Sequence, residues 1–523
     1  MKTNALRGIF LIACVLTASC HLWAMPQKYI TYEQFGAKGD GVHDDLEAIA
    51  AAHRAANEQH LPVRAADDKT YLIGKGATTV VIKTDVDFGK AKFIINDVET
   101  DNYKSWVFRV ESYLKPYDVE GVTSLKRGQQ NIGVKFPQNS LIEVINDRKK
   151  VYIRYGLNQN SGTPAREVFV VDKKGNVRDK SQIVWDYDHI SQIKAYPMDK
   201  ETLTIKGGIF TTVANQAPST YAYRSRGFII NRSNVRVEGV THYVTGELDH
   251  GAPYRGFLYV DHCADVVLSN CLFTAHKTYV TIGSAKKPVS MGSYDTGAMS
   301  AVNVLFEHCR QTTDIDDNKY WGLYASNFCK DLRMDDCHFS RFDAHMGVAN
   351  VTLTNCKFGY MGVRMVGFGT IRMENCEVRY NTLIALRDDY GSSWDGDIII
   401  KNCTLRPVNP NYRSLTILSG TNTGKHDFGY LCRLPYKMVI DGLTVDDSAL
   451  NPDKYEHLAI FATFNRDAHD TGLLPFPIEG QVILKNVKVQ SGRECIVNKV
   501  RSLCKNKCEY LCFCRRRYKF ATF

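Results

Sequence analysis

Basic, acidic and aromatic residues gather in the middle of this chain at fixed distances from cysteines. His345 follows Cys337 by eight residues, and Arg364 follows Cys356 by the same eight. A histidine accepts a proton near neutral pH with little adjustment of its pKa, and an arginine carries a lasting positive charge that binds carboxylates. Together they could remove a proton next to an acidic group, which is the first step of an elimination reaction.

The neighbouring residues supply the other groups that such a reaction needs. A polysaccharide lyase must neutralise a uronate carboxylate, remove the adjacent C5 proton and protonate the leaving oxygen. We assign Arg364 or Lys277 to neutralisation, His345 to the base, and Tyr324 or Tyr279 to the acid. We expect the substrate to be held by Lys277, Tyr279, Tyr320, Arg387 and Asp388.

A repeat built on an Asn-Cys or Asp-Cys pair positions these residues. Six segments share one pattern of alternating apolar and polar residues around a cysteine, with intervals of 38, 28, 19, 20 and 27 residues between cysteines. A minimal period near 20 that is stretched by insertions is typical of a stacked solenoid. The segments are 266–273, 302–309, 332–339, 351–358, 371–378 and 398–405, and degenerate copies follow at 438–445 and 482–489.

The alternation within each repeat slips by one residue at the Asn, which indicates a corner between two strands. Asn and Asp tolerate the left-handed backbone that such a corner needs. We expect a ladder of corner residues at Asn270, Asp336, Asn355, Asn375 and Asn402. A third strand follows in each coil, at 342–346, 363–366 and 383–386. The chain is therefore predicted to be an all-β, single-stranded parallel β-helix.

The start of the mature chain differs from the coils. The segment Phe35-Gly-Ala-Lys-Gly-Asp-Gly-Val-His-Asp-Asp45 precedes an Ala-rich stretch, Leu46 to Gln59, which we expect to form a capping helix with Asp44 or Asp45 as its N-cap. This segment resembles the N-terminal signature of the pectate-lyase-like superfamily of right-handed parallel β-helix proteins. The resemblance implies a right-handed helix with substrate along the third strand, and it leaves the reaction open because the superfamily includes lyases, glycosidases and phage tailspikes.

Outward residues of the third strand form the predicted substrate row. In this strand Phe342, Ala344 and Met346 should point inward, and equal offsets from the cysteines should stack side chains about 4.8 Å apart on adjacent coils. Aromatic, basic and acidic side chains in one row suit an acidic sugar chain. The row is Lys277, Tyr279, Tyr320, Tyr324, Asp343, His345, Arg364, Arg387 and Asp388.

Two other functions fit the same row. A glycoside hydrolase would use Asp343 and Asp388, which lie two coils apart, or roughly 9.6 Å, near the upper end of the ~6.5–9.5 Å carboxylate separation of inverting enzymes. A non-catalytic glycan-binding surface protein would use the row for binding alone. Surface charges on a solvated sheet would produce a similar pattern.

Charge and the N-terminal segment indicate where the protein works. Residues 1–24 contribute +2 and residues 495–523 contribute +7 to a net charge of +10, which leaves +1 for residues 25–494. We expect no nucleic-acid partner. Residues 1–24 have the features of a signal peptide, with possible lipoprotein cleavage before Cys20. The protein is predicted to be extracytoplasmic, with no membrane contact except through this lipid anchor.

The cysteines, the C-terminal tail and one acidic cluster lead to further predictions. The nine cysteines of residues 25–494 are regularly spaced, which favours packing over disulfides. The Cys/Arg-rich tail at 495–523 matches no coil and no common zinc spacing, and we assign it no function. We expect no cofactor, although Asp314, Asp316 and Asp317 could hold Ca²⁺. The region 101–230 shows no motif.

Overall fold

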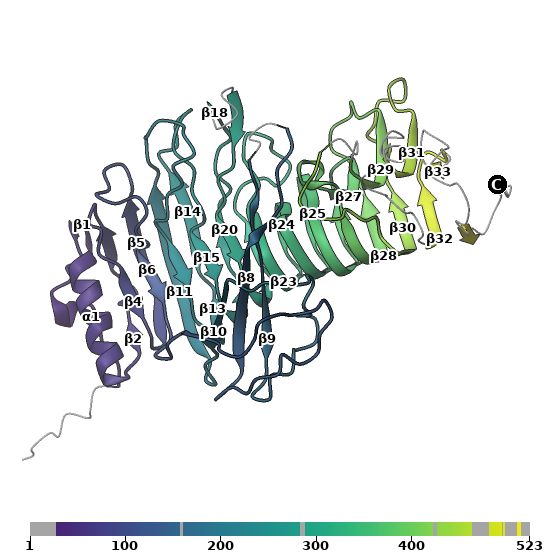
Figure 1. Cartoon of the computed structure of the whole chain (residues 1–523). Coiled ribbons are helices and arrows are strands. Elements are labelled where there is room, and N and C mark those ends of the chain that lie inside the picture. Colours follow the sequence, from purple (N-terminus) through teal and green to yellow (C-terminus); the bar gives the residue numbers. More distant parts are fainter. Residues whose placement is uncertain are drawn as a thin grey trace, which may run out of the picture.

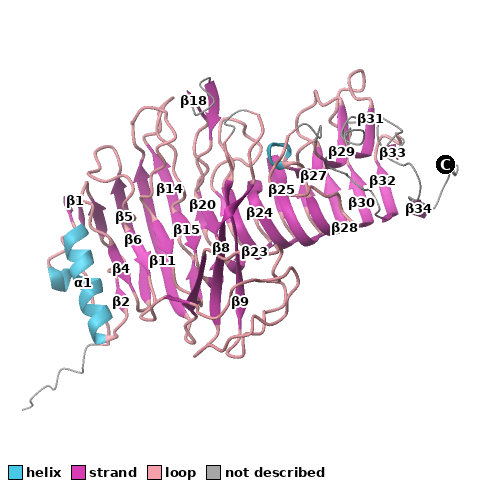
Figure 2. Ribbon diagram, viewed as in Figure 1, coloured by secondary structure: helices cyan, strands magenta, loops and turns pink. Residues whose placement is uncertain are grey.

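The computed structural model describes residues 28–156, 160–282, 288–421, 426–462, 481–493, 495–496 and 510–513. These residues form a right-handed parallel β-helix with three stacks of strands, as predicted (Figures 1 and 2). Within this part of the chain no helix is long and apolar enough to cross a membrane. The predicted signal peptide, residues 1–24, lies outside the described residues.

Three stacks of parallel strands run along the molecule. The first contains β2 (Val63–Arg64), β5 (Val86–Asn96), β11 (Leu203–Val213), β13 (Val235–Glu238), β16 (Ala264–Ser269), β21 (Val302–Glu307), β23 (Tyr324–Asp335), β24 (His338–Thr354), β25 (Lys357–Glu374), β28 (Trp394–Leu405), β30 (Lys437–Val445) and β32 (Gln481–Val489). The second contains β1 (Asp40–Asp44), β3 (Thr70–Ile73), β14 (Thr241–Thr245), β17 (Leu272–Phe273), β22 (Arg310–Gln311) and β26 (Glu377–Val378). Longer strands continue from one stack into the next.

The third stack is the one that was predicted to carry substrate. It contains β4 (Val80–Ile82), β6 (Phe108–Val110), β12 (Phe228–Ile230), β15 (Leu258–Asp261), β20 (Thr296–Met299), β27 (Thr382–Leu386), β29 (Ser414–Ser419), β31 (His457–Phe461) and β33 (Cys495–Ile496), together with parts of β23, β24 and β25. In the tail, β33 pairs with β31, and β34 (Tyr510–Phe513) pairs with β32.

The capping helix has the predicted bounds. Helix α1 (Leu46–Gln59) lies over the N-terminal end of the solenoid (Figure 1), after the short 3-10 helix η1 (Glu33–Phe35). Asp45 occupies the N-cap, but its carboxylate accepts the backbone N–H groups of Lys38 and Gly39, at 2.6 and 3.1 Å. Asp44 instead accepts the N–H of Leu46 at 3.1 Å. Asp45 therefore fixes the loop that precedes the helix, and Asp44 accepts a hydrogen bond from the first residue of the helix.

The Asn/Asp ladder forms as predicted. All five corner residues have left-handed backbone angles, with φ between 46° and 56°. The corner side chains also bond between coils: the Asn375 amide donates to the Asn355 side chain at 3.2 Å, and the Asn355 amide donates to Asp335 at 3.0 Å. The corner is thus stabilised by backbone preference and by hydrogen bonds along the axis.

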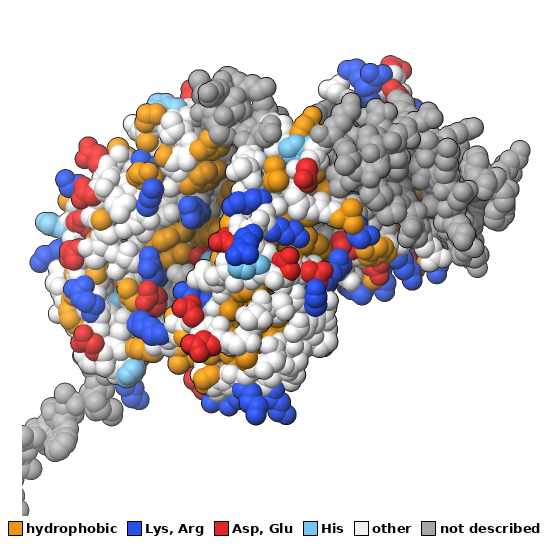
Figure 3. All heavy atoms as spheres, viewed as in Figure 1, with side chains coloured by type: hydrophobic (Ala, Val, Ile, Leu, Met, Phe, Trp, Pro, Cys, Tyr) orange, Lys and Arg blue, Asp and Glu red, His pale blue; other side chains and the backbone are white. Residues whose placement is uncertain are grey.

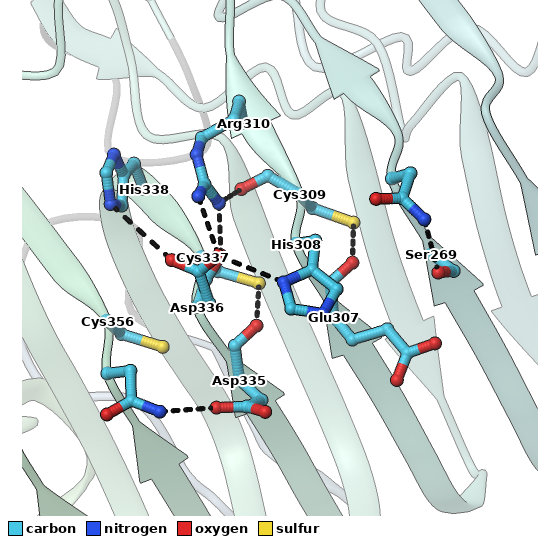
Figure 4. A network of polar contacts seen from close by, with 12 residues as sticks. Ser269, Glu307, His308, Cys309, Arg310, Asp335, Asp336, Cys337, His338 and Cys356 are labelled. Carbon is cyan, nitrogen blue, oxygen red and sulfur yellow. Dashed lines mark hydrogen bonds and ion pairs between the residues drawn. The ribbon is translucent and has the colours of Figure 1, made fainter.

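The cysteine that follows each corner is a buried packing residue. The Sγ–H groups of Cys309 and Cys337 donate to the backbone carbonyls of Glu307 and Asp335, each at 3.4 Å (Figure 4). No disulfide joins the cysteines at 271, 309, 337, 356, 376 and 403. Outside the same corner, Asp336 accepts from His308 at 2.9 Å and from Arg310 at 2.8 Å (Figure 4). The cysteines therefore fill the core, as the regular spacing predicted.

Most of the uninterpreted region 101–230 is an insertion with its own sheet. Between β6 and β11 the chain forms an antiparallel sheet with the order β7 (Tyr117–Asp118), β10 (Gln192–Pro197), β8 (Ser140–Val151) and β9 (Thr163–Val171). Figure 1 shows β8 and β9 in front of β23 and β24. The insertion buries its own apolar cluster, which includes Phe169 and Tyr187.

The insertion is fixed to the solenoid by a buried ion pair as well as by apolar contacts. Val168 and Val170 pack against Ala264 and Val302 of the first stack. The Lys330 ammonium donates to the Glu167 carboxylate at 2.5 Å, and both side chains are only 3% exposed. Removing one member of a buried pair leaves an uncompensated charge, so loss of either Lys330 or Glu167 would destabilise the docked insertion.

A second polar contact makes the docking pH-dependent. His262 bonds Asp261 at 2.7 Å and Glu143 of the insertion at 3.1 Å. Burial lowers the pKa of His262, but the hydrogen bonds to Asp261 and Glu143 outweigh it and raise the pKa to about 9. Burial likewise opposes the ionised Glu143, but His262 and Arg166 lower its pKa to about 2. Both groups are therefore charged at neutral pH.

We expect the free energy of unfolding to fall as the pH rises from about 6.5 to about 9. A histidine whose pKa is raised by folding stabilises the fold fully below its unfolded pKa and loses that contribution as the pH passes through the folded value. The loss from His262 is on the order of 3 kcal/mol. Urea unfolding at both pH values measures it. The pKa of His276 is also raised to about 9, so the His262→Gln variant should keep a fall that is smaller by the His262 contribution. An equal fall in both proteins would contradict the assignment.

Candidate functional site

A β-bulge in β24 changes the direction of the His345 side chain. Ser326 of β23 pairs with Ala344, but the next residue, Asn327, pairs with Met346, so His345 is an extra residue in the ladder. A bulge bends the strand and changes the direction of the side chain, and bulges recur beside active sites. The Asn327 side chain accepts the N–H of Met346 at 3.1 Å, which holds the bulge.

The bulge and a longer loop overturn the predicted stacking of His345 on Arg364. Phe339 pairs with Phe358, but Arg341 pairs with Gly362, so the coil of Arg364 has two extra residues before its third strand. The partner of Arg364 is consequently Asp343. Counting eight residues from the cysteine assumed coils of equal path length, and the prediction of equivalent positions is wrong for this pair.

Asp343 lies beside Arg364 on the third stack but is completely buried. Its carboxylate accepts from Arg387 through both oxygens, each at 2.9 Å, and from Arg341. Burial alone would raise the pKa of Asp343, but Arg341 and Arg387 outweigh it and hold the pKa well below its usual range. The predicted outward, accessible Asp343 is wrong because two guanidinium groups cover it.

Arg387 connects this carboxylate to the insertion. It donates to Asp389 at 2.8 Å through a second nitrogen, and Asp389 also pairs with Arg154 at 3.0 Å. Arg154 follows β8, so one side of the cluster comes from the insertion. We call Arg154, Arg341, Asp343, Arg387 and Asp389 the Arg/Asp network. The network contains three guanidinium groups and two carboxylates, so its net charge is positive.

His345 lies beside this network. Its ring contacts Tyr390 of the 3-10 helix η2 (Asp388–Tyr390), with centroids 5.3 Å apart. Burial first, and the positive charge of Arg387 second, lower the pKa of His345 to about 3. The imidazole is therefore neutral at physiological pH, but a pKa of about 3 makes it a weaker base than the near-neutral histidine that was expected. An anion that enters the site would offset the guanidinium charge and raise this pKa.

Aromatic side chains extend the site on the other side of Asp343. The guanidinium of Arg341 lies over the rings of Trp321 and Tyr294, 5.4 and 5.9 Å from their centroids. Arg364 is half-buried, donates to the Tyr380 hydroxyl at 2.9 Å, and has no carboxylate partner among the described residues. Figure 3 shows Lys/Arg and Asp/Glu side chains mixed where the insertion crosses the coils. Basic, acidic and aromatic side chains therefore meet around Asp343, but they are not the single outward row that was predicted.

Tyr324 is not at the site. It is 0% exposed and its ring stacks on Phe342 with centroids 5.4 Å apart, inside the hydrophobic core. The predicted outward orientation of Tyr324 is wrong, because the strand starts at this residue with its side chain inward. Phe342 and Ala344 point inward as predicted and are fully buried, and Met346 is partly buried against the core.

Three predicted substrate-binding residues lie in the inserted hairpin and in loops, not on the third strand. The third strand of the Cys271 coil is β20, because the hairpin β18 (Tyr279–Ile282) and β19 (Pro288–Met291) is inserted before it. Lys277 donates through its ammonium to the Glu247 backbone carbonyl at 3.0 Å, and the buried Tyr279 donates to the Glu247 carboxylate at 3.1 Å. Tyr320 bridges Lys277 in the loop before β23. Their predicted places on the strand are wrong.

The remaining acids have separate roles. Asp388 is exposed in η2, where its carboxylate accepts the N–H of Asp389 at 3.0 Å. Of the three aspartates considered for Ca²⁺, Asp316 pairs with Arg379 at 2.5 Å and Asp314 accepts the N–H of Asp316 at 3.0 Å. The described residues contain no group of three His, Cys, Asp or Glu side chains that could hold a metal ion.

Several residues of the site were not singled out in the sequence. Asp389 is adjacent to the predicted Asp388, and Trp321 is adjacent to the predicted Tyr320, so each lay one residue from a predicted position. Arg154 belongs to the insertion, and no local pattern links it to residue 389. Arg154 is identified only by its contact with Asp389 in the folded structure, because the two residues are far apart in the sequence.

Comparison with known proteins gives the fold. No protein-family model and no curated protein matches the sequence. Among solved structures, the tailspike of Pseudomonas phage phi297 covers 88% of this chain and 81% of its own at 12% identity, with a TM-score of 0.51. A tailspike of the Acinetobacter baumannii phage AP22, in complex with capsular saccharide, covers 88% and 75% at 11% identity (TM-score 0.48). The mannuronan C-5 epimerase A-module of Azotobacter vinelandii covers 90% and 97% at 10% identity (TM-score 0.40). The likeness to the phi297 tailspike shows that this chain is a right-handed parallel β-helix protein.

Proposed function

We propose that this β-helix protein binds and processes a glycan at the face formed by His345 and the Arg/Asp network. More specifically, we propose that the protein is a polysaccharide lyase that cleaves a uronic-acid-containing chain by β-elimination. The observation that carries it is the neutral His345 imidazole beside a network in which arginines outnumber carboxylates. A uronate would be attracted to this positive charge, and the same binding event would make His345 a stronger base.

Each chemical requirement of the elimination has a candidate group. Arg364, which has no carboxylate partner among the described residues, is placed to neutralise the uronate. His345 takes the C5 proton. Tyr294 is the best-placed proton donor, because its hydroxyl points at Asp343 at 3.5 Å and its ring lies beneath Arg341. It replaces Tyr324 and Tyr279, whose hydroxyls are buried.

The hydrolase alternative receives less support. An inverting hydrolase needs one protonated carboxylic acid, and the predicted pair assigned Asp343 to this chemistry. Two guanidinium groups form ion pairs with the Asp343 carboxylate, which favour its ionised form. A glycan-binding protein without turnover would use the same face. The predicted signal peptide in residues 1–24 makes an extracytoplasmic location part of the proposal.

We expect the protein to raise the absorbance of unsaturated uronate when it is incubated with an acidic polysaccharide. The panel is polygalacturonate, alginate and a glycosaminoglycan, with a neutral glucan as the control that lacks an acidic C5 proton. A rise with one acidic polymer and none with the neutral polymer supports elimination. New reducing ends without the chromophore would instead indicate the hydrolase, and binding with neither product would indicate the non-catalytic protein.

A further inference from the structure

A cavity of about 780 Å³ lies where the insertion meets the loop at residues 426–431. Its volume is within the roughly 300–1,000 Å³ of sites for small ligands. The end of β8 forms one wall, and Tyr430 and Leu431 contribute apolar surface on another. The cavity is separate from the Arg/Asp network and is not used in the proposed reaction.

Three consecutive cations line this cavity without acidic partners. Arg148, Lys149 and Lys150 form no ion pair with any described residue, whereas Arg154 a few residues later is paired with Asp389. Lys149 lies over the Trp185 ring, 5.4 Å from its centroid. The three cations therefore give the cavity a local excess of positive charge that no described carboxylate compensates by an ion pair.

The acidic groups of the cavity do not cancel these charges. Asp188 accepts the Asn146 amide at 3.2 Å, and Asp427 accepts the N–H of Gly429 at 2.7 Å. His189, the remaining titratable group of the lining, lies 3.7 Å from Asp147. Two carboxylates thus face three permanent cations, and each carboxylate already accepts a hydrogen bond from the protein.

The walls of the cavity are held in place by contacts between distant parts of the sequence. A Cβ added at Gly429 would lie 2.2 Å from the Lys150 carbonyl oxygen, so only glycine fits against this strand. The N–H of Ile153 donates to the Phe428 carbonyl at 3.1 Å. Tyr152 packs on Tyr430 with ring centroids 5.0 Å apart. Residues 152–155 therefore form a wall with the cavity at Ile153 and the Arg/Asp network at Arg154.

We propose that this cavity is a second binding site for a saccharide that carries carboxylate or sulfate groups. The unpaired cations would bind the anionic groups, and Tyr430 and Leu431 would contact the apolar face of a sugar ring. The inference goes beyond the proposed function, because it requires no reaction at His345. A chain that binds at both places would pass the wall formed by residues 152–155.

The test is the affinity of the full chain for a short oligogalacturonate and for a sulfated oligosaccharide, measured by calorimetry at low salt. The double variant Arg148→Gln/Lys150→Gln should weaken binding of at least one of these probes by about tenfold. The matched control is Lys173→Gln/Lys174→Gln, which removes the same charge from an exposed turn of the same insertion and should leave the affinity unchanged. A neutral oligosaccharide should not bind the cavity.

The possible outcomes are distinct. Equal losses in both double variants would show a general charge effect and overturn the proposal, as would unchanged binding in the cavity variant. Inorganic sulfate that competes fully at equal ionic strength would show an anion site without saccharide recognition and would also overturn it. Because these readouts are affinities, they are separate from the cleavage that tests His345, and either proposal can fail without the other.

Discussion

The Arg387→Ala variant should lose about 3–5 kcal/mol of unfolding free energy, the cost of removing one partner from a buried ion pair. Arg387 binds both oxygens of the fully buried Asp343 and both oxygens of Asp389. Without it, each carboxylate keeps only one guanidinium partner, Arg341 or Arg154. Urea unfolding monitored by circular dichroism measures the loss.

Two further variants make this expectation specific. Arg387→Lys keeps the charge but not the planar fork that binds two carboxylates, so it should recover only part of the stability. Arg364→Ala is the matched control, because Arg364 is on the adjacent coil and has no carboxylate partner in the described part of the chain. We expect that control to cost about 1 kcal/mol or less. Equal losses in Arg387→Ala and Arg364→Ala would contradict the structural role of the network.

The second large effect concerns His345. Replacing it with glutamine keeps a neutral polar side chain but removes the basic nitrogen, so turnover should fall by about 10²–10⁴-fold, the usual contribution of a general base. Binding of the polysaccharide should persist, because the cations of the site remain. The matched control is His308→Gln, since His308 lies at a corner outside the core and bonds only Asp336 among the described side chains.

The fold was predictable because its determinants are local in the sequence. An Asn at the corner, such as Asn355 or Asn375, favours the left-handed backbone by its own side chain, and the Cys after it is small and apolar. The helix Leu46–Gln59 likewise follows from composition and caps. The inward residues Phe342 and Ala344 follow from the alternation within one strand.

The site was less predictable because it depends on path length and on distant contacts. One bulge residue at His345 and two extra residues before Arg364 shifted the register between neighbouring coils. The hairpin after Tyr279 moved the third strand of its coil to β20. Arg154 reaches Asp389 only after the insertion has docked on the solenoid. Periodicity identifies the strands, but the loops between them decide which side chains meet.

The central claim is that His345 accepts a proton from a bound acidic glycan. The most direct measurement compares wild-type, His345→Gln and His308→Gln proteins with the acidic polymer that gives unsaturated uronate, and records both initial rate and dissociation constant. We predict that His345→Gln alone loses its rate by at least about 10²-fold while its dissociation constant stays within a few fold of wild type. A His345→Gln rate equal to that of wild type and His308→Gln would contradict the account.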